Sequence, residues 1–212
     1  MLAIEGILSG VRRNTPHRAY EETRRRSHGG APRLPVVGRV ILASPIRKLA
    51  NNPAGILAPF VRPGMTVLEP GPGMGFFTLE LARLVGPTGR VIAVDVQPKM
   101  IEALRRRSRR AGLFDRIDAR VATATSMEVK DFEAKIDFVL AFAVVHEMPS
   151  AELFFAEAAQ AMKPGARLLL AEPAGHVGGE EFDRELNLAA KHGLSVANRP
   201  SIRRSLVAVL KR

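Results

Sequence analysis

From residue 65 onward, short apolar runs alternate with segments in which apolar residues recur every three or four positions. The runs predict buried strands, and the longer spacing predicts amphipathic helices. Strands are expected at residues 65–68, 90–94, 117–122, 136–143, 167–171, 194–198 and 205–210, and helices at 76–85, 98–111, 150–163 and 180–192. The run 136–143 is apolar almost throughout, which is typical of a strand covered on both faces. We therefore expect a doubly wound α/β sheet with helices on both faces.

The end of the chain predicts a departure from a purely parallel sheet. A short turn separates the last two expected strands, which indicates an antiparallel pair. The third of these helices is expected to end at Pro164-Gly165, just before the fifth strand. The pattern as a whole predicts a seven-stranded, mostly parallel sheet with an antiparallel C-terminal strand.

Charge is concentrated at the start of the chain. The net charge is +11, and residues 1–48 hold nine Arg, one Lys and three Glu. Residues 1–33 are therefore expected to form a basic, flexible arm, which could bind nucleic acid or another anionic surface. The cluster Arg105 to Arg110 is expected to be mostly a solvated helix face rather than an RNA contact.

Two absences narrow the protein class. The 212 residues include no cysteine, which excludes a disulfide scaffold, a zinc–thiolate centre, an iron–sulfur cluster and a cysteine nucleophile. The longest apolar runs are too short to span a bilayer, which needs about 20 residues, and residues 1–10 make a poor secretion signal. These features predict a cytoplasmic protein without a membrane partner.

A glycine-rich turn carries the most informative chemistry. The segment Glu69-Pro70-Gly71-Pro72-Gly73-Met74-Gly75 follows the first strand, and Asp95 ends the second. A carboxylate at that position can accept hydrogen bonds from ribose hydroxyls, although an aspartate there can also be a simple helix cap. Phe76 stands where the dinucleotide fingerprint requires its third glycine, and no Gly-Lys-Ser/Thr follows. The turn therefore does not match an NAD site or a P-loop.

The same segment resembles motif I of the class I S-adenosylmethionine-dependent methyltransferases, acidic-x-Gly-x-Gly-x-Gly. Residues 91–95 resemble the next motif of that family, 136–140 its fourth strand, and 163–168 its entry to the fifth strand. The resemblance covers about residues 53–210. It implies the Rossmann-like methyltransferase fold, S-adenosyl-L-methionine as cofactor and S-adenosyl-L-homocysteine as product.

The resemblance also implies a set of cofactor-binding residues. The glycines and Glu69 would place the methionine part, Asp95 the ribose, and Val96 the adenine. Ala124 stands where many members carry an acid, so adenine recognition would rest on a backbone amide or a neighbouring hydroxyl. The full expected cofactor set is Glu69, Gly71, Pro72, Gly73, Gly75, Asp95, Val96, Thr123, Ala124, Ala141 and Phe142.

Four residues are candidates for the acceptor side. His146 and Glu147 follow the fourth strand and are the catalytic candidates, because a histidine can accept a proton near neutral pH. Glu172 and His176 follow the fifth strand and are candidates for substrate binding. No two of these have a recognised metal-ligand spacing, so no metal is expected. Each could instead have only a local structural role.

The expected domain is a single methyltransferase unit over residues 34–212, with residues 34–60 as a helical cap over the active site. The run Val145-His146-Glu147 resembles the small-molecule and quinone-type members, and the Asn-x-Pro-aromatic motif of the adenine dimethyltransferases is absent. We expect a small-molecule acceptor, in a monomer or homodimer. The alternatives are an RNA methyltransferase that uses the arginine-rich arm and a non-catalytic S-adenosylmethionine-binding module.

Overall fold

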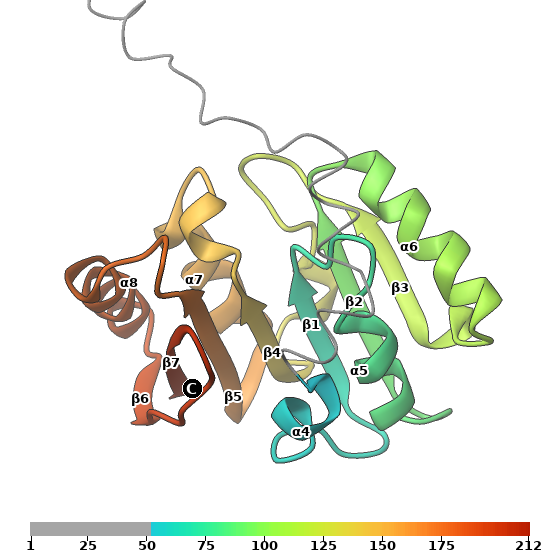
Figure 1. Ribbon diagram of the computed structural model, residues 1–212, viewed down its shortest axis with the longest axis horizontal. Coiled ribbons are helices and arrows are strands. Elements are labelled where there is room, and N and C mark those ends of the chain that lie inside the picture. Colours follow the sequence, from blue (N-terminus) through green and yellow to red (C-terminus); the bar gives the residue numbers. More distant parts are fainter. Residues whose placement is uncertain (1–51) are drawn as a thin grey trace, which may run out of the picture. The chain divides into compact units, whose positions relative to one another are not determined.

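A computed structural model describes residues 52–212, and its strands form one seven-stranded sheet (Figure 1). The strands are β1 (Thr66–Pro70), β2 (Arg90–Asp95), β3 (Ile117–Val121), β4 (Ile136–Phe142), β5 (Met162–Pro173), β6 (Ser195–Asn198) and β7 (Ser205–Lys211). The helices are α4 (Pro53–Leu57), α5 (Thr78–Leu84), α6 (Pro98–Arg110), α7 (Ala151–Ala161) and α8 (Gly179–Lys191). Three short 3-10 turns are η1 (Phe114–Arg116), η2 (Lys130–Phe132) and η3 (Val145–Glu147).

The strand order is β3-β2-β1-β4-β5-β7-β6. Pairing is parallel from β3 to β5, and β7 is antiparallel to both β5 and β6. The chain runs outward from β1 to β3 and then returns to β4 on the other side of β1. Ligands of such sheets bind at the carboxyl ends of the strands beside this reversal. The predicted doubly wound, mostly parallel sheet is confirmed.

Helices cover both faces of the sheet, as the buried residues show. Leu57 of α4, Leu81 of α5 and Leu104 of α6 belong to one hydrophobic cluster. Phe155 of α7 and Leu186 of α8 belong to the other. Strand β4 contributes side chains to both clusters, which explains why its sequence is apolar almost without interruption.

Polar caps and glycines set the helix ends, as the sequence indicates. The Asn52 side chain accepts a hydrogen bond from the Gly55 amide (3.2 Å) at the start of α4. The Ser150 hydroxyl accepts one from the Leu153 amide (3.2 Å) at the start of α7. Gly112, with φ +67°, follows the end of α6.

Strand β5 is longer than predicted at both ends. Helix α7 ends at Ala161, and Met162 already pairs with Ile136 of β4, so the helix does not continue to Pro164. At the other end, β7 pairs with β5 as far as Pro173. Glu172 therefore lies within a strand and not on a loop, contrary to the sequence-based expectation.

Some predictions concern residues beyond this part of the chain. The basic arm at residues 1–33 and most of the cap expected at 34–60 lie outside the described residues. Helix α4 lies within the stretch expected to form the cap. No helix within residues 52–212 is long and apolar enough to cross a membrane.

Candidate functional site

The glycine turn after β1 is formed by three residues with positive φ: Gly71 (+65°), Gly73 (+55°) and Gly75 (+85°). A Cβ on Gly71 would overlap Val144, and one on Gly75 would lie 2.5 Å from Leu104 Cδ1. Among residues 52–212, no atom lies within 4 Å of a Cβ on Gly73. The outer two glycines are therefore required by packing against the protein, whereas no packing contact in this part of the chain requires the middle one. Pro72 stands between the first two glycines.

Glu69, the acidic residue before the turn, is buried without full hydrogen bonding. It is 4% exposed, and its Oε2 has no hydrogen-bond partner in the described part of the chain. Burial raises the pKa of Glu69 to about 8; the nearby Thr78 hydroxyl opposes this rise and the negative charge of Asp95 adds to it. A buried acid with an unused oxygen is suited to a positively charged or hydrogen-bond-donating ligand group.

Asp95 ends β2 beside the turn and is 8% exposed. Its Oδ1 accepts a hydrogen bond from the Gln97 amide at 2.9 Å. Gln97, and not Asp95, is the N-cap residue of α6, so the helix-cap alternative does not hold. Val96 is 54% exposed, which leaves an apolar surface next to this carboxylate.

The loop after β3 lies against the end of β2. The Ala122 amide donates to the Asp95 carbonyl oxygen (3.0 Å), and the Thr123 amide donates to Ser126 (2.9 Å). The Thr123 hydroxyl accepts from the Thr125 amide (3.3 Å), and Thr123 and Ala124 are both exposed. The loop expected to contact adenine thus lies next to Asp95. Hydrogen bonds of Thr123 stabilise the backbone of this loop.

The end of β4 forms the other border of the turn. Ala141 is fully buried, and Phe142 is half-buried with its ring 4.5 Å from that of Phe77. Ala143 then takes a φ of +55° and donates from its amide to Ala171 of β5 (2.7 Å). This bend directs the following residues, including His146 in η3, toward the end of β5.

His146 and Glu172 form a hydrogen-bonded pair at the ends of β4 and β5. Glu172 is 0% exposed. Its Oε1 accepts from the amides of Val144 (3.3 Å) and Val145 (2.8 Å), and its Oε2 bonds to Nδ1 of His146. The bond to Glu172 raises the pKa of His146, with burial opposing and the charges of nearby glutamates adding. Both Glu172 oxygens are thus engaged within the protein rather than presented to a substrate.

Three further ionisable residues surround this pair. The ring of His176, an exposed residue, lies edge-on to that of His146 with centroids 6.0 Å apart. Glu147 is exposed. Glu185 of α8 is 5% exposed, and burial, together with the charges of Glu172 and Glu181, raises its pKa to about 7 while His146 opposes this. Within residues 52–212, no three acidic or histidine side chains are arranged to hold a metal ion.

Glu185 was not predicted from the sequence, although a signal exists. Phe182, Leu186 and Ala189 are buried on the inner face of α8, and position 185 falls on that same face at helical spacing. A carboxylate within the apolar face of a helix indicates a buried polar group, which is uncommon unless the group is paired.

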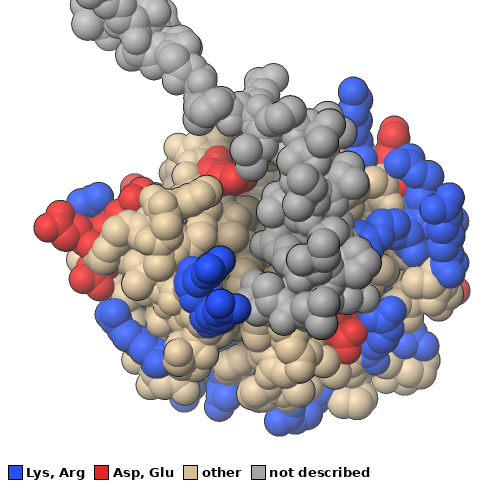
Figure 2. All heavy atoms as spheres, viewed as in Figure 1, with Lys and Arg blue, Asp and Glu red and all other residues tan. Residues whose placement is uncertain are grey.

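Three arginines of α6 contact other parts of the protein. Arg107 donates to the Met74 carbonyl oxygen in the glycine turn, and burial lowers its pKa. Arg105 donates to Ala119 (2.7 Å), and Arg109 lies 4.2 Å from the centre of the Phe114 ring. Figure 2 shows basic side chains over the edge of the molecule that carries α6. Arg105, Arg106, Arg109 and Arg110 are exposed, as expected of a mostly solvated face, whereas Arg107 is half-buried and contacts the turn.

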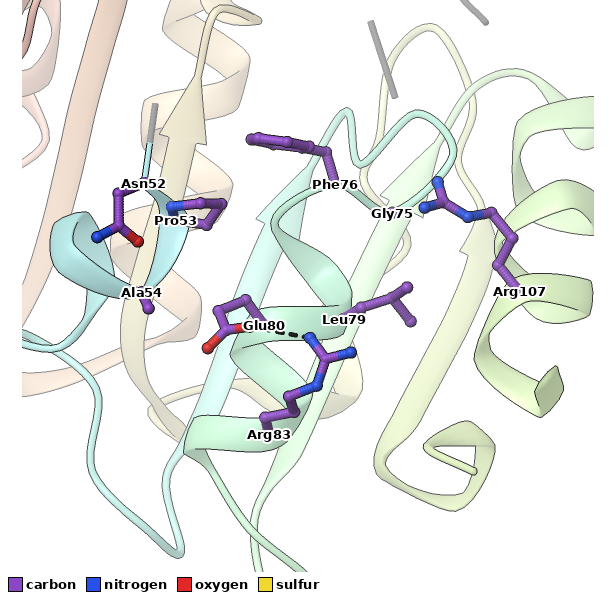
Figure 3. Close-up of a pocket in the computed structure, with 9 residues that line it drawn as sticks. All are labelled: Asn52, Pro53, Ala54, Gly75, Phe76, Leu79, Glu80, Arg83 and Arg107. Atoms are coloured by element: carbon purple, nitrogen blue, oxygen red, sulfur yellow. Dashed lines mark hydrogen bonds and ion pairs between the residues drawn. The ribbon is translucent and has the colours of Figure 1, made fainter. Parts of the chain in front are cut away.

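A pocket of about 200 Å³ adjoins the turn on the α5 side (Figure 3). It is lined by Asn52, Pro53, Ala54, Gly75, Phe76, Leu79, Glu80, Arg83 and Arg107. Arg83 is paired with Glu80 at 2.9 Å. Of the expected cofactor residues, Gly75 lines this pocket, whereas Glu69 and Asp95 do not.

Comparison with known proteins identifies the class. A family model described as "Methyltransferase domain" matches residues 62–197, more than half of the chain. The chain is 30% identical over 112 residues to the ubiquinone/menaquinone biosynthesis C-methyltransferase UbiE of Klebsiella pneumoniae (53% of this chain, 44% of that protein). It is 30% identical over 122 residues to an arsenite methyltransferase of Halobacterium salinarum (58% and 30%). The chain thus spans less than half the length of these relatives. It belongs to the methyltransferase domain family.

The fold agrees with this membership. A SAM-dependent methyltransferase from Aquifex aeolicus superimposes with a TM-score of 0.73 at 24% identity, covering 84% of this chain and 98% of that one. The [4+2]-cyclase SpnF also shares the fold, with a TM-score of 0.59 at 19% identity. The class and the motif I turn indicate S-adenosylmethionine as the cofactor.

The residues present fit that cofactor. The space in front of Gly73 gives a ligand access to the backbone of the turn. The unpartnered Glu69 Oε2 suits the ammonium of a methionine moiety, and Asp95 with Val96 offers a carboxylate beside an apolar surface for a nucleoside. The donor set includes no feature that would exclude the group.

Proposed function

We propose that the chain transfers a methyl group from S-adenosylmethionine to a small-molecule acceptor and that His146 accepts the proton lost by the acceptor's nucleophile. The observation that carries this proposal is the pairing of His146 with the buried Glu172 at the carboxyl ends of β4 and β5. Strand β4 neighbours β1, whose end carries the glycine turn. The proposed base, His146, thus lies at the carboxyl ends of the strands, where ligands of such sheets bind.

The cofactor, when bound, supplies an electrophilic methyl group on a sulfonium centre. The turn from Gly71 to Gly75 and Glu69 would hold its methionine part, and Asp95, Val96 and the loop at Thr123 and Ala124 its nucleoside. Ala141 and Phe142 border the space between the turn and His146. The protein's contribution is then orientation of the two reactants, exclusion of water and acceptance of a proton at His146 Nε2.

The names of the curated relatives support a small-molecule acceptor. A ubiquinone/menaquinone biosynthesis C-methyltransferase and an arsenite methyltransferase are both similar to this chain. The absence of cysteine speaks against thiol-dependent arsenite chemistry, so an organic acceptor with an ionisable hydroxyl, amine or activated carbon is favoured. We assign Glu172 a role other than the substrate contact expected from sequence, because both of its carboxylate oxygens are hydrogen-bonded within the protein. His176 and Glu147, whose side chains are exposed, remain proposed acceptor contacts.

Calorimetric titration of the purified chain tests the cofactor assignment. S-adenosylmethionine and S-adenosylhomocysteine are expected to bind with micromolar affinity and NAD not to bind. Asp95→Ala should weaken binding about 10- to 100-fold, because a hydrogen bond to a charged group contributes about 1.5–3 kcal/mol.

Asp115→Ala is the matched control, since Asp115 is an exposed aspartate in η1, and it should bind like the unaltered chain. Absence of binding by a folded wild-type protein would contradict the proposal. With binding established, formation of S-adenosylhomocysteine is followed across hydroxylated, amine and quinone-type acceptors.

A further inference from the structure

The geometry points to Glu172 as the positioning residue that fixes the tautomer of His146, with hydrogen on Nδ1 and the lone pair on Nε2. This inference rests on the proposed function only in assigning Nε2 the role of proton acceptor. The tautomer itself is a property of the chain without cofactor or acceptor.

The hydrogen-bond partners of Glu172 determine which group each of its two carboxylate oxygens faces. Backbone N–H groups can only donate, so Oε1 must accept from Val144 and Val145. Oε2 then faces Nδ1 of His146. Two backbone donors converge on Oε1, an arrangement suited to a carboxylate, which can only accept hydrogen bonds. The hydrogen in the bond to His146 therefore belongs to Nδ1, and the neutral ring carries its lone pair on Nε2.

The carboxylate is also held rigidly in position. Glu172 lies inside β5, where it pairs with Leu206 of β7, and its side chain is completely buried. A residue on a strand with three hydrogen bonds to its carboxylate cannot rotate away from the ring without leaving buried donors unpaired. The ring of His146 is consequently oriented by the sheet, although His146 itself lies in the short turn η3.

Glu147, the residue next to the ring in sequence, does not take this part. It is exposed, and its backbone amide donates to the Val144 carbonyl oxygen (3.1 Å). Its charge adds to the raised pKa of His146, as does that of Glu185, but less than the bond to Glu172 does. His176 faces the same ring edge-on. Of these four groups, Glu172 alone has a hydrogen bond to His146 in the described structure.

Replacing Glu172 by glutamine gives a sharp test, because an amide has one acceptor atom instead of two. The amides of Val144 and Val145 would bond to the new carbonyl oxygen, which turns the NH₂ group toward Nδ1 of His146. Nδ1 must then accept, so the hydrogen moves to Nε2 and the proposed base loses its lone pair. Glu172→Gln is expected to invert the tautomer and to lower the pKa of His146, because the charge-assisted bond that raises it is lost.

The measurement is long-range ¹H–¹⁵N correlation of the histidine rings in the apo protein, which distinguishes protonated from unprotonated ring nitrogens. The chain has five histidines, and the spectrum of a His146→Gln variant assigns the signal. Glu147→Gln is the matched control and should leave the tautomer unchanged. Binding of S-adenosylhomocysteine to each variant shows whether the fold and the cofactor site persist.

Two results would overturn the inference: hydrogen on Nε2 in the wild-type neutral ring, or an unchanged tautomer in Glu172→Gln. The wild-type spectrum alone decides the first, even when a variant fails to fold. The proposed function fails separately, if S-adenosylhomocysteine does not bind, whatever the histidine spectra show. With an acceptor in hand, Glu172→Gln should lower kcat at unchanged cofactor affinity and alter the pH profile.

Discussion

Alanine at position 73 is expected to abolish binding of S-adenosylmethionine while the apo protein stays folded. The Cβ of Gly73 would meet no atom of residues 52–212 within 4 Å, so this part of the chain leaves room for the methyl group, which is expected to meet the ligand. Placing a methyl group where a ligand lies against the backbone should weaken binding by about 100-fold or more. The residue's φ of +55° adds only about 1–2 kcal/mol of strain.

Gly75→Ala is the matched comparison, because it makes the same change two residues away. Its Cβ would lie 2.5 Å from Leu104 Cδ1, so this variant should lose several kcal/mol of stability, as overpacked cores do. Calorimetry with S-adenosylhomocysteine and thermal unfolding of both variants make the distinction. Unimpaired binding by Gly73→Ala would show that the cofactor lies elsewhere.

The stability of the apo protein is expected to fall as pH rises from about 4.5 to about 8, through Glu69. Its pKa is raised by burial to about 8 in the folded chain, against an ordinary value of 4.5. Between these values the folded state keeps a proton that the unfolded state has lost, so raising the pH favours unfolding. The contribution is complete below 4.5, and up to about 1.4 kcal/mol is lost per pH unit across the window.

Glu69→Gln should remove this contribution, because the amide stays neutral at every pH. Chemical unfolding between pH 5.5 and 8.5 is expected to show a shallower dependence for this variant than for the wild type. A matching slope in both proteins would mean that Glu69 is ionised in the folded state. Glu80→Gln, at a partly exposed glutamate of α5, is the control.

The same residue should couple cofactor binding to a proton. An ammonium group beside Glu69 favours the carboxylate, so binding near pH 7 is expected to release close to one proton in the wild type. Glu69→Gln should release about one proton fewer. Calorimetry in buffers of different ionisation enthalpy measures the number released, and equal numbers in the two proteins would contradict this role.

The fold was predictable because each strand and helix carries its own local pattern. Strand β4 is apolar on both faces, and α7 begins at a serine cap, features that neighbouring residues alone decide. The extent of β5 was not predictable in this way. Its first residue pairs with β4, and its last residues, Glu172 and Pro173, pair with β7 from more than 30 positions away in sequence.

The candidate site divides along the same line. The glycine turn and Asp95 are adjacent to strand ends and could be found from spacing. The bond between His146 and Glu172 joins residues 26 positions apart, and nothing local indicates that Glu172 is buried beneath the histidine. The burial of Glu185 and the contact of Arg107 with the turn likewise depend on which face of each helix meets the sheet.

Val144 connects the two halves of this site. Its side chain lies against Gly71 of the turn, and its amide donates to the carboxylate that holds His146. Binding of the cofactor in the glycine turn and a change in the charge of His146 therefore both act on Val144. By thermodynamic reciprocity, any amount by which cofactor binding alters the proton affinity of His146 equals the amount by which protonation alters cofactor affinity. The affinity for the cofactor would then depend on pH through His146.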